Sequence, residues 1–134
     1  MTDKELLKTA IDARNDTYTP YSNFTVGAAL MTKSGKVYTG GNIENASFTA
    51  GICAERVAFF KAINSGEKEF AKIAVAGGKA GEKPVFCSPC GVCRQVMSEF
   101  CDDDFEVILG TLDDYKVYKL DEVLPFRFGP KDLS

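Results

Sequence analysis

The sequence predicts an α/β fold in which helices pack on a central mixed sheet, and three observations predict it. Helical and strand patterns follow one another in the order helix, hairpin, helix, strand, helix, strand, strand. The strand expected at Lys72–Gly77 is apolar without alternation, which is typical of a strand buried on both faces. The 134-residue chain is 45% hydrophobic and shows no linker or repeat, so we expect a single domain over residues 1–134.

The first part of the chain is expected to form a helix and a hairpin. Thr2-Asp3-Lys4-Glu5 has the form of a capping box, and apolar residues then recur at helical spacing, which predicts an amphipathic helix over residues 3–15. Phe24–Thr32 has the composition of a buried strand. Lys33-Ser34-Gly35-Lys36 is a turn signal, and Val37–Ile43 is expected to run back as the hairpin partner.

The second part supplies two more helices and the remaining strands. Helical spacing of apolar residues predicts a helix over about residues 50–64, with Cys53 in its first turn. Another helix is expected at Pro89–Phe100, with Cys90 and Cys93 in its first turn. An acidic, solvated turn and two strands complete the chain, at residues 102–104, 105–109 and 116–120.

Composition and charge narrow the class of partner. The formal net charge is -3 and Lys and Arg are scattered, which disfavours a nucleic-acid partner and favours a small, weakly charged substrate. The polar N-terminus and the lack of a long apolar run predict a cytoplasmic protein with no membrane partner. The chain has no histidine, so acid–base chemistry falls to carboxylates, a thiol, a lysine or metal-activated water.

Three of the five cysteines are spaced as metal ligands. Cys53, Cys90 and Cys93 offer thiolates suited to zinc, and three protein ligands leave the fourth tetrahedral position open, as in catalytic zinc sites. Glu55 lies two residues after the first ligand, where a carboxylate can pass protons to and from a metal-activated water. A ligand-x-Glu followed by Pro-Cys-x-x-Cys is the known signature of zinc deaminases.

The chain resembles the small, homotetrameric type of cytidine deaminase. The similarity extends over nearly the whole length, and its motifs occur in the family's order. They are Pro20-Tyr21-Ser22, Phe24-x-Val26-Gly27-Ala28-Ala29, Gly41-Asn42-Ile43-Glu44-Asn45-Ala46, Cys53-Ala54-Glu55-Arg56, Pro89-Cys90-Gly91-x-Cys93-Arg94-Gln95, and Leu124-Pro125 with Phe128. The resemblance implies a three-layer α/β/α sandwich with a central mixed five-stranded sheet, assembled as a homotetramer with active sites at subunit interfaces.

The resemblance also implies the reaction and its machinery. The reaction is hydrolytic deamination of cytidine and deoxycytidine to uridine and deoxyuridine plus ammonia, in pyrimidine salvage. One Zn²⁺ per chain would be held by Cys53, Cys90 and Cys93. Glu55 would be the proton shuttle between water, the ring nitrogen N3 and the departing ammonia.

Six residues match the family's nucleoside contacts. Asn42 and Glu44 match residues that hydrogen-bond the ribose hydroxyls. The backbone N–H of Ala54 would bind the pyrimidine, and the carbonyl of Ser88 would face the leaving amine. Phe24 matches an aromatic beside the nucleoside, and Phe128 matches one that a neighbouring subunit contributes to stack on the base. From the residues alone, Asn42 and Glu44 could instead be a turn-forming pair, and the two phenylalanines could be core residues.

Three thiolates bring three negative charges to a divalent ion, which weakens it as a Lewis acid. Two features could offset this charge. Cys53 and the Cys90–Cys93 pair lie at helix N-termini, whose dipoles favour anions. Arg56 lies three residues after Cys53 on the same helical face and could donate a hydrogen bond to its sulfur. The alternative for Arg56 is a surface or interface salt bridge.

Several interpretations stay open at this point. Cys87 extends the spacing to Cys-x-x-Cys-x-x-Cys, which resembles part of an iron–sulfur ligand set, but we expect it to be a bystander. Arg94 and Gln95 could support the metal site or form helix surface. A deaminase acting on a nucleoside antibiotic such as blasticidin S is the nearest functional alternative. A structural zinc or iron–sulfur module is the alternative of another class.

Overall fold

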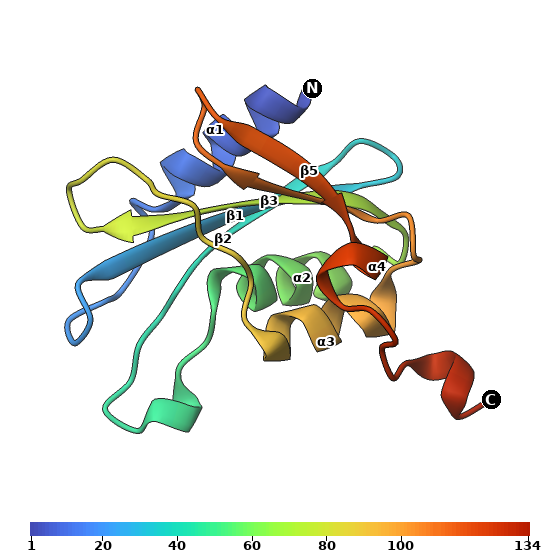
Figure 1. Ribbon diagram of the computed structural model, residues 1–134. Helices are drawn as coiled ribbons and strands as arrows, with labels where there is room; N and C mark the ends of the chain where they lie inside the picture. Colours follow the sequence, from blue (N-terminus) through green and yellow to red (C-terminus); the bar gives the residue numbers. More distant parts are fainter.

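A mixed five-stranded sheet forms the centre of the molecule, whose computed structural model describes residues 1–134 (Figure 1). The strand order is β2-β1-β3-β4-β5. The β1 strand runs antiparallel to β2 and β3, β3 and β4 are parallel, and β4 and β5 are antiparallel. The bounds are β1 Phe24–Thr32, β2 Val37–Gly41, β3 Phe70–Lys79, β4 Glu106–Gly110 and β5 Tyr115–Lys119. The predicted mixed sheet is confirmed.

Helices cover both faces of this sheet, so the fold is the three-layer sandwich that the family resemblance implies (Figure 1). Helix α1 packs on one face, while α2 and α3 pack on the other. Short helices follow β5 and end the chain. The bounds are α1 Asp3–Ala13, the 3₁₀ helix η1 Phe48–Ala50, α2 Ala54–Asn64, α3 Gly91–Phe100, α4 Leu120–Val123 and the 3₁₀ helix η2 Pro130–Asp132.

Each face of the sheet has its own apolar core. On the α1 side, Leu6 and Leu7 are fully buried against alanines of β1 and β3. On the other side, Phe59 of α2 is fully buried and its ring meets that of Phe70 edge-on at 5.2 Å between centroids. Burying one such side chain contributes about 2–3 kcal/mol. This second core holds α2 and α3 on the same face, which brings their N-termini to one side of the molecule.

Two glycines let helices approach the sheet at backbone distance. A Cβ on Gly40 of β2 would lie 2.3 Å from the carbonyl oxygen of Ala54, the first residue of α2. A Cβ on Gly27 of β1 would lie 2.0 Å from the carbonyl oxygen of Ala10 in α1. Only glycine permits these contacts. The start of α2 is therefore set by direct contact between main chains.

Some element boundaries differ from those predicted. The helix expected over residues 50–64 begins at Ala54, because Ile52 pairs with Ile43 through two backbone hydrogen bonds of 2.9 and 3.0 Å and is extended. The partner strand ends at Gly41 rather than Ile43, because the Asn42 side chain bonds the backbone of β1. The first helix ends at Ala13, and the third begins at Gly91.

The later strands also differ at their ends. The β3 strand is longer than the apolar run Lys72–Gly77 indicates, because it pairs with β1 as far as Lys79. The two final strands are displaced by one residue, and Leu120 begins α4, which the sequence analysis does not predict.

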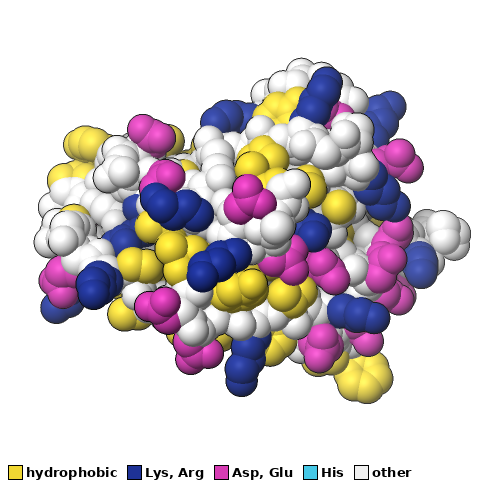
Figure 2. All heavy atoms as spheres, turned by 90° about the horizontal axis from the view of Figure 1, so that it is seen from above, with side chains coloured by type: hydrophobic (Ala, Val, Ile, Leu, Met, Phe, Trp, Pro, Cys, Tyr) yellow, Lys and Arg dark blue, Asp and Glu magenta, His cyan; other side chains and the backbone are white.

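The surface shows mixed charge. On the face seen in Figure 2, Lys and Arg side chains are interspersed with Asp and Glu and form no continuous basic track. None of the helices combines the length and the apolar character that crossing a membrane requires.

Candidate metal centre

The three predicted ligands lie at the N-termini of two helices. Cys53 is the N-cap of α2 and Cys90 is the N-cap of α3, both with extended backbone. Cys93 lies in the first turn of α3 and is buried. Neither N-cap side chain accepts a hydrogen bond from the backbone N–H groups of its own helix. The sulfurs are therefore free for another partner, in a place where helix dipoles stabilise negative charge.

The sulfur positions fit a tetrahedral zinc ion. The three Sγ atoms all lie within 4.8 Å of one another, and those of Cys53 and Cys90 are 3.7 Å apart. Zn–S bonds of about 2.3 Å at tetrahedral angles separate two sulfurs by about 3.8 Å. No fourth His, Cys, Asp or Glu belongs to this group. The donor set therefore fits zinc and leaves one coordination position for a non-protein ligand.

Protons are shared unequally among these thiols. Hydrogen bonding from the Cys93 thiol, then from Arg56 and Cys90, lowers the pKa of Cys53 to about 5. The same hydrogen bond, together with burial, raises the pKa of Cys93. Of Cys53 and Cys93, Cys53 is therefore the first to become a thiolate. Zinc binding requires all three thiolates, so it releases the remaining protons.

Glu55 lies beside the sulfurs in the first turn of α2. Its side chain is buried, with 4% of the residue exposed, and it lines the same cleft as Cys53 and Cys90. Burial, with a smaller contribution from the negative charge of Cys53, raises the pKa of Glu55 to about 7. A carboxyl group with such a pKa can both accept and return a proton near neutral pH.

Arg56 contacts the first ligand. Its Nη2 donates to the Cys53 Sγ at 3.4 Å, whereas its Nε is buried without a hydrogen-bond partner. No carboxylate pairs with it, so the salt-bridge alternative finds no support within this chain. We infer that the guanidinium offsets thiolate charge at the metal.

Arg56→Ala is expected to lower turnover about 10- to 100-fold while zinc content falls less, because the change leaves all three sulfurs in place. Zinc per chain by atomic emission and kcat on the same preparation check this. Arg56→Lys, which keeps the charge, is the matched variant and should retain more activity. Full activity in Arg56→Ala would remove the charge-compensation role.

A cleft of about 700 Å³ opens above the sulfurs. It contains most of the predicted site residues: Asn42, Glu44, Cys53, Ala54, Glu55, Arg56, Ser88 and Cys90. Cys93 lies behind it, buried in α3. Phe24 is absent from the lining but lies on the same face of β1 as Val26, which lines the cleft. Phe128 lies outside the cleft, 59% exposed on the C-terminal segment.

Asn42 and Glu44 are each held by backbone groups. The Asn42 amide accepts from Val26 N at 2.9 Å and donates to Phe24 O at 3.0 Å, which uses half of its hydrogen-bonding capacity. Glu44 Oε1 accepts from the backbone N–H of Tyr21 and Ser22 at 2.9 and 3.1 Å. The Ser22 hydroxyl and these N–H groups lower the pKa of Glu44, so it is a fixed carboxylate at the cleft wall.

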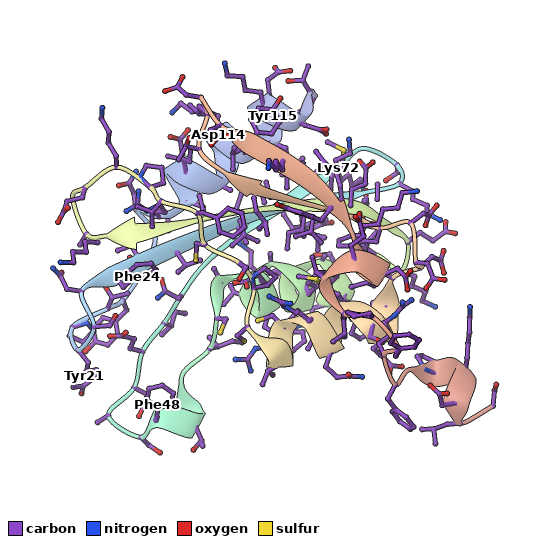
Figure 3. The ribbon with its side chains drawn as sticks, viewed as in Figure 1. Tyr21, Phe24, Phe48, Lys72, Asp114 and Tyr115 are labelled. Atoms are coloured by element: carbon purple, nitrogen blue, oxygen red, sulfur yellow. The ribbon has the colours of Figure 1, made fainter.

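The structure adds residues that the sequence analysis does not assign. Tyr21 and Phe48, which line the cleft, are 65% and 95% exposed, and Figure 3 shows both on the side of the molecule where Phe24 lies. The motif Pro20-Tyr21-Ser22 supplies the two N–H groups that bind Glu44. Because these are backbone groups, the side-chain types in the motif do not predict the contacts.

Cys87 also lines the cleft but does not belong to the sulfur group. A Cβ on Gly77 would lie 2.6 Å from its Sγ, so the thiol packs against bare backbone of β3. Burial raises the pKa of Cys87 to about 11, which keeps it a thiol. This environment supports the bystander interpretation and offers no fourth ligand for an iron–sulfur cluster.

Comparison with known proteins identifies similar chains. Residues 1–109 match the family model described as the cytidine and deoxycytidylate deaminase zinc-binding region. A cytidine deaminase of Halalkalibacterium halodurans is 47% identical over 130 residues, which cover 96% of each chain. A probable cytidine deaminase of Dictyostelium discoideum is 42% identical, over 97% of this chain and 88% of that one.

Solved structures agree with these sequence matches. The crystal structure of a cytidine deaminase from Burkholderia pseudomallei superposes with a TM-score of 0.86 at 45% identity, covering 96% of this chain and 100% of that one. The crystal structure of a cytidine deaminase from Mycobacterium tuberculosis gives a TM-score of 0.80 at 31% identity, covering 96% and 99%.

Proposed function

This chain belongs to the cytidine and deoxycytidylate deaminase family, and on that basis we propose that it deaminates cytidine and deoxycytidine hydrolytically. The products are uridine or deoxyuridine and ammonia. One observation supports this reaction most directly. A buried carboxyl group, Glu55, lies in one cleft with a three-sulfur zinc site that has no fourth protein ligand.

The chemistry divides between the metal and the chain. When bound, zinc supplies a Lewis acid that makes water a nucleophile at neutral pH. The Glu55 carboxylate takes a proton as the oxygen of water bonds to C4 of the cytosine ring and gives that proton to N3. Glu55 then takes the remaining proton from the new hydroxyl group on C4 and gives it to the amine nitrogen. The bond between C4 and that nitrogen breaks, which leaves ammonia and the C4 carbonyl of the product. The pKa of Glu55 near 7 suits both directions of transfer.

The nucleoside is oriented by the cleft wall. The backbone N–H of Ala54, at the start of α2, is one of the unpaired donors of a helix N-terminus and would bind the pyrimidine. The carbonyl of Ser88 would accept from the leaving amine. The remaining amide capacity of Asn42 and the carboxylate of Glu44 would bind the ribose hydroxyls, with Phe24 alongside the nucleoside.

We further propose that the chain, as one domain, assembles into a homotetramer in which Phe128 of each subunit enters a neighbouring cleft. The support is that Phe128 lies outside the cleft of its own chain, while Phe48 and Phe126 are almost fully exposed. Sedimentation equilibrium should give four times the 14.6 kDa chain mass. A monomer at micromolar concentration would contradict this assembly. A cytoplasmic location and a place in pyrimidine salvage stay predictions.

The substrate preference is tested by following the loss of ultraviolet absorbance as a cytosine nucleoside is deaminated. Cytidine and deoxycytidine should both react. Free cytosine should show a kcat/KM reduced by about 100-fold or more, because it lacks the ribose and so loses about two or three hydrogen bonds. Blasticidin S, assayed by ammonia release, is the comparison substrate. Preference for blasticidin S over cytidine would move the proposal to an antibiotic deaminase. Equal rates with cytosine would remove the ribose contacts.

A further inference from the structure

Arg94 makes an unusual set of contacts beside the metal centre. It follows the ligand Cys93 directly and is half-buried in α3. Its Nε donates to the carbonyl of Pro89 at 2.8 Å, its Nη1 to the carbonyl of Val123 at 2.6 Å, and its Nη2 to the hydroxyl of Ser88 at 3.3 Å. No carboxylate pairs with it. The guanidinium therefore binds the loop that precedes α3, through Ser88 and Pro89, and the C-terminal end of α4, through Val123.

That loop has no other hydrogen bond. Residues 86–89 belong to no helix or strand, and no backbone hydrogen bond outside those elements involves them. The only side-chain hydrogen bonds to residues 86–89 come from Arg94. This segment leads directly into the ligand Cys90, and its Ser88 carbonyl is the group proposed to face the leaving amine. Its position therefore depends on Arg94 and on apolar packing.

The contact with the Val123 carbonyl connects Arg94 and its loop to helix α4. Val123 is the last residue of α4, and carbonyls at a helix C-terminus lack partners within the helix. Arg94 satisfies one of them and adds a positive charge where the helix dipole favours it. Helix α4 packs against α3, so the loop is fixed to a second element rather than to α3 alone (Figure 1).

We propose that Arg94 is a positioning residue that holds Ser88 and Pro89 in place, and through them the ligand Cys90. Its side chain makes no hydrogen bond to the three sulfurs and does not line the cleft. Its planar fork reaches the three acceptors from three separate nitrogens, whereas a lysine would have to reach them from one. The Ser88 part of this inference rests on the proposed deaminase function, whereas the Cys90 part rests only on the metal centre.

Arg14 provides a matched control on the far side of the sheet. Its Nε donates to the carbonyl and the hydroxyl oxygen of Thr25 at 3.2 and 3.1 Å, and its Nη2 to the carbonyl of Lys79 at 3.0 Å. It thus makes three hydrogen bonds of the same kind, but it fastens the end of α1 to β1 and β3. Arg14→Gln separates general loss of stability from a specific effect at the metal.

The test compares wild type, Arg94→Gln, Arg94→Lys and Arg14→Gln. Zinc affinity is measured by competition with a chromogenic chelator, and ligand geometry by the thiolate-to-metal absorption of the Co²⁺-substituted protein. We expect Arg94→Gln to bind zinc about 10- to 100-fold more weakly and to shift the cobalt bands. It should also lower kcat for cytidine by more than it raises KM. Arg94→Lys should lie between it and wild type.

Arg14→Gln should lower the melting temperature while leaving zinc affinity, cobalt bands and kcat unchanged. Wild-type zinc affinity and cobalt bands in Arg94→Gln would overturn the inference, as would equal effects from Arg14→Gln. If Arg94→Gln does not fold, Arg94→Lys decides the question by the same readouts. The two metal readouts need no substrate, so a wild-type protein that fails to deaminate cytidine would refute the proposed function without refuting the role of Arg94 at Cys90.

Discussion

Glu55→Gln is expected to abolish most turnover while zinc content and fold are retained. The amide is nearly isosteric with the carboxyl group but cannot accept and return a proton, and loss of a general acid–base group lowers kcat by about 10²- to 10⁴-fold. The site is buried and its carboxyl group is destabilised by burial, so a neutral side chain should not reduce the melting temperature. Single-turnover kinetics with cytidine, zinc analysis and thermal melting on one preparation measure the three quantities.

Glu99→Gln is the matched control, because Glu99 is exposed on α3 and its side chain makes no hydrogen bond or ion pair. It should leave kcat unchanged. A near-normal rate in Glu55→Gln with one zinc per chain would refute the proton-shuttle assignment. Lost activity accompanied by lost zinc would show instead that Glu55 supports the metal.

Removal of zinc is expected to eliminate activity and lower stability together. A ligand that binds only the folded state adds about 4 kcal/mol when its free concentration is 1,000 times Kd. In a chain of this size, that free energy raises the melting temperature by roughly 10 °C or more. Chelator-treated protein should therefore melt earlier and should recover both activity and melting temperature with one equivalent of zinc.

Single cysteine variants identify the ligands. Cys53→Ala, Cys90→Ala and Cys93→Ala should each lose most bound zinc, because two thiolates hold the ion far less tightly. Cys87→Ala is the matched control, since Cys87 lies in the same segment but outside the sulfur group. Its zinc content should stay at one per chain. Loss of zinc in Cys87→Ala, or an iron-dependent colour in wild type, would contradict the three-cysteine site.

The metal centre could be predicted from the sequence because its determinants are local. Cys90 and Cys93 are brought together by one helix turn, and the apolar period of the preceding helix places Cys53 and Glu55 at its start. The N-termini of these two helices lie close together once both helices pack on the same face of one sheet. The predicted strands supply that sheet, and the structure confirms it.

Contacts between distant segments could not be predicted. Glu44 is bound by the backbone N–H groups of Tyr21 and Ser22, which every residue except proline carries. The three acceptors of Arg94 include the end of α4, a four-residue helix too short to show a period. The sequence predicts too early a start for α2, because Ile52 fits the helical pattern although its backbone pairs with Ile43.

The C-terminal segment illustrates the same limit. Its attachment depends on the Phe128 carbonyl, which accepts from Gln95 Nε2 at 2.7 Å and from Ser98 Oγ at 3.1 Å. Arg127 adds an ion pair with Asp103. These partners lie 24 to 33 residues apart in sequence and share no periodicity with the segment. Gln95 thus belongs to the anchoring of this segment, which the residue type alone does not indicate.

The main-chain contact at Gly40 has a consequence for engineering. Gly40 of β2 contacts the first turn of α2 without an intervening side chain. The distance of Glu55 from the sheet is therefore set by Gly40, which does not line the cleft. Libraries that vary only the cleft wall, for instance to accept altered nucleosides, preserve this spacing by construction. Libraries that also vary Gly40 should contain inactive variants even where every residue that lines the cleft is unchanged, because a side chain at position 40 would displace the start of α2.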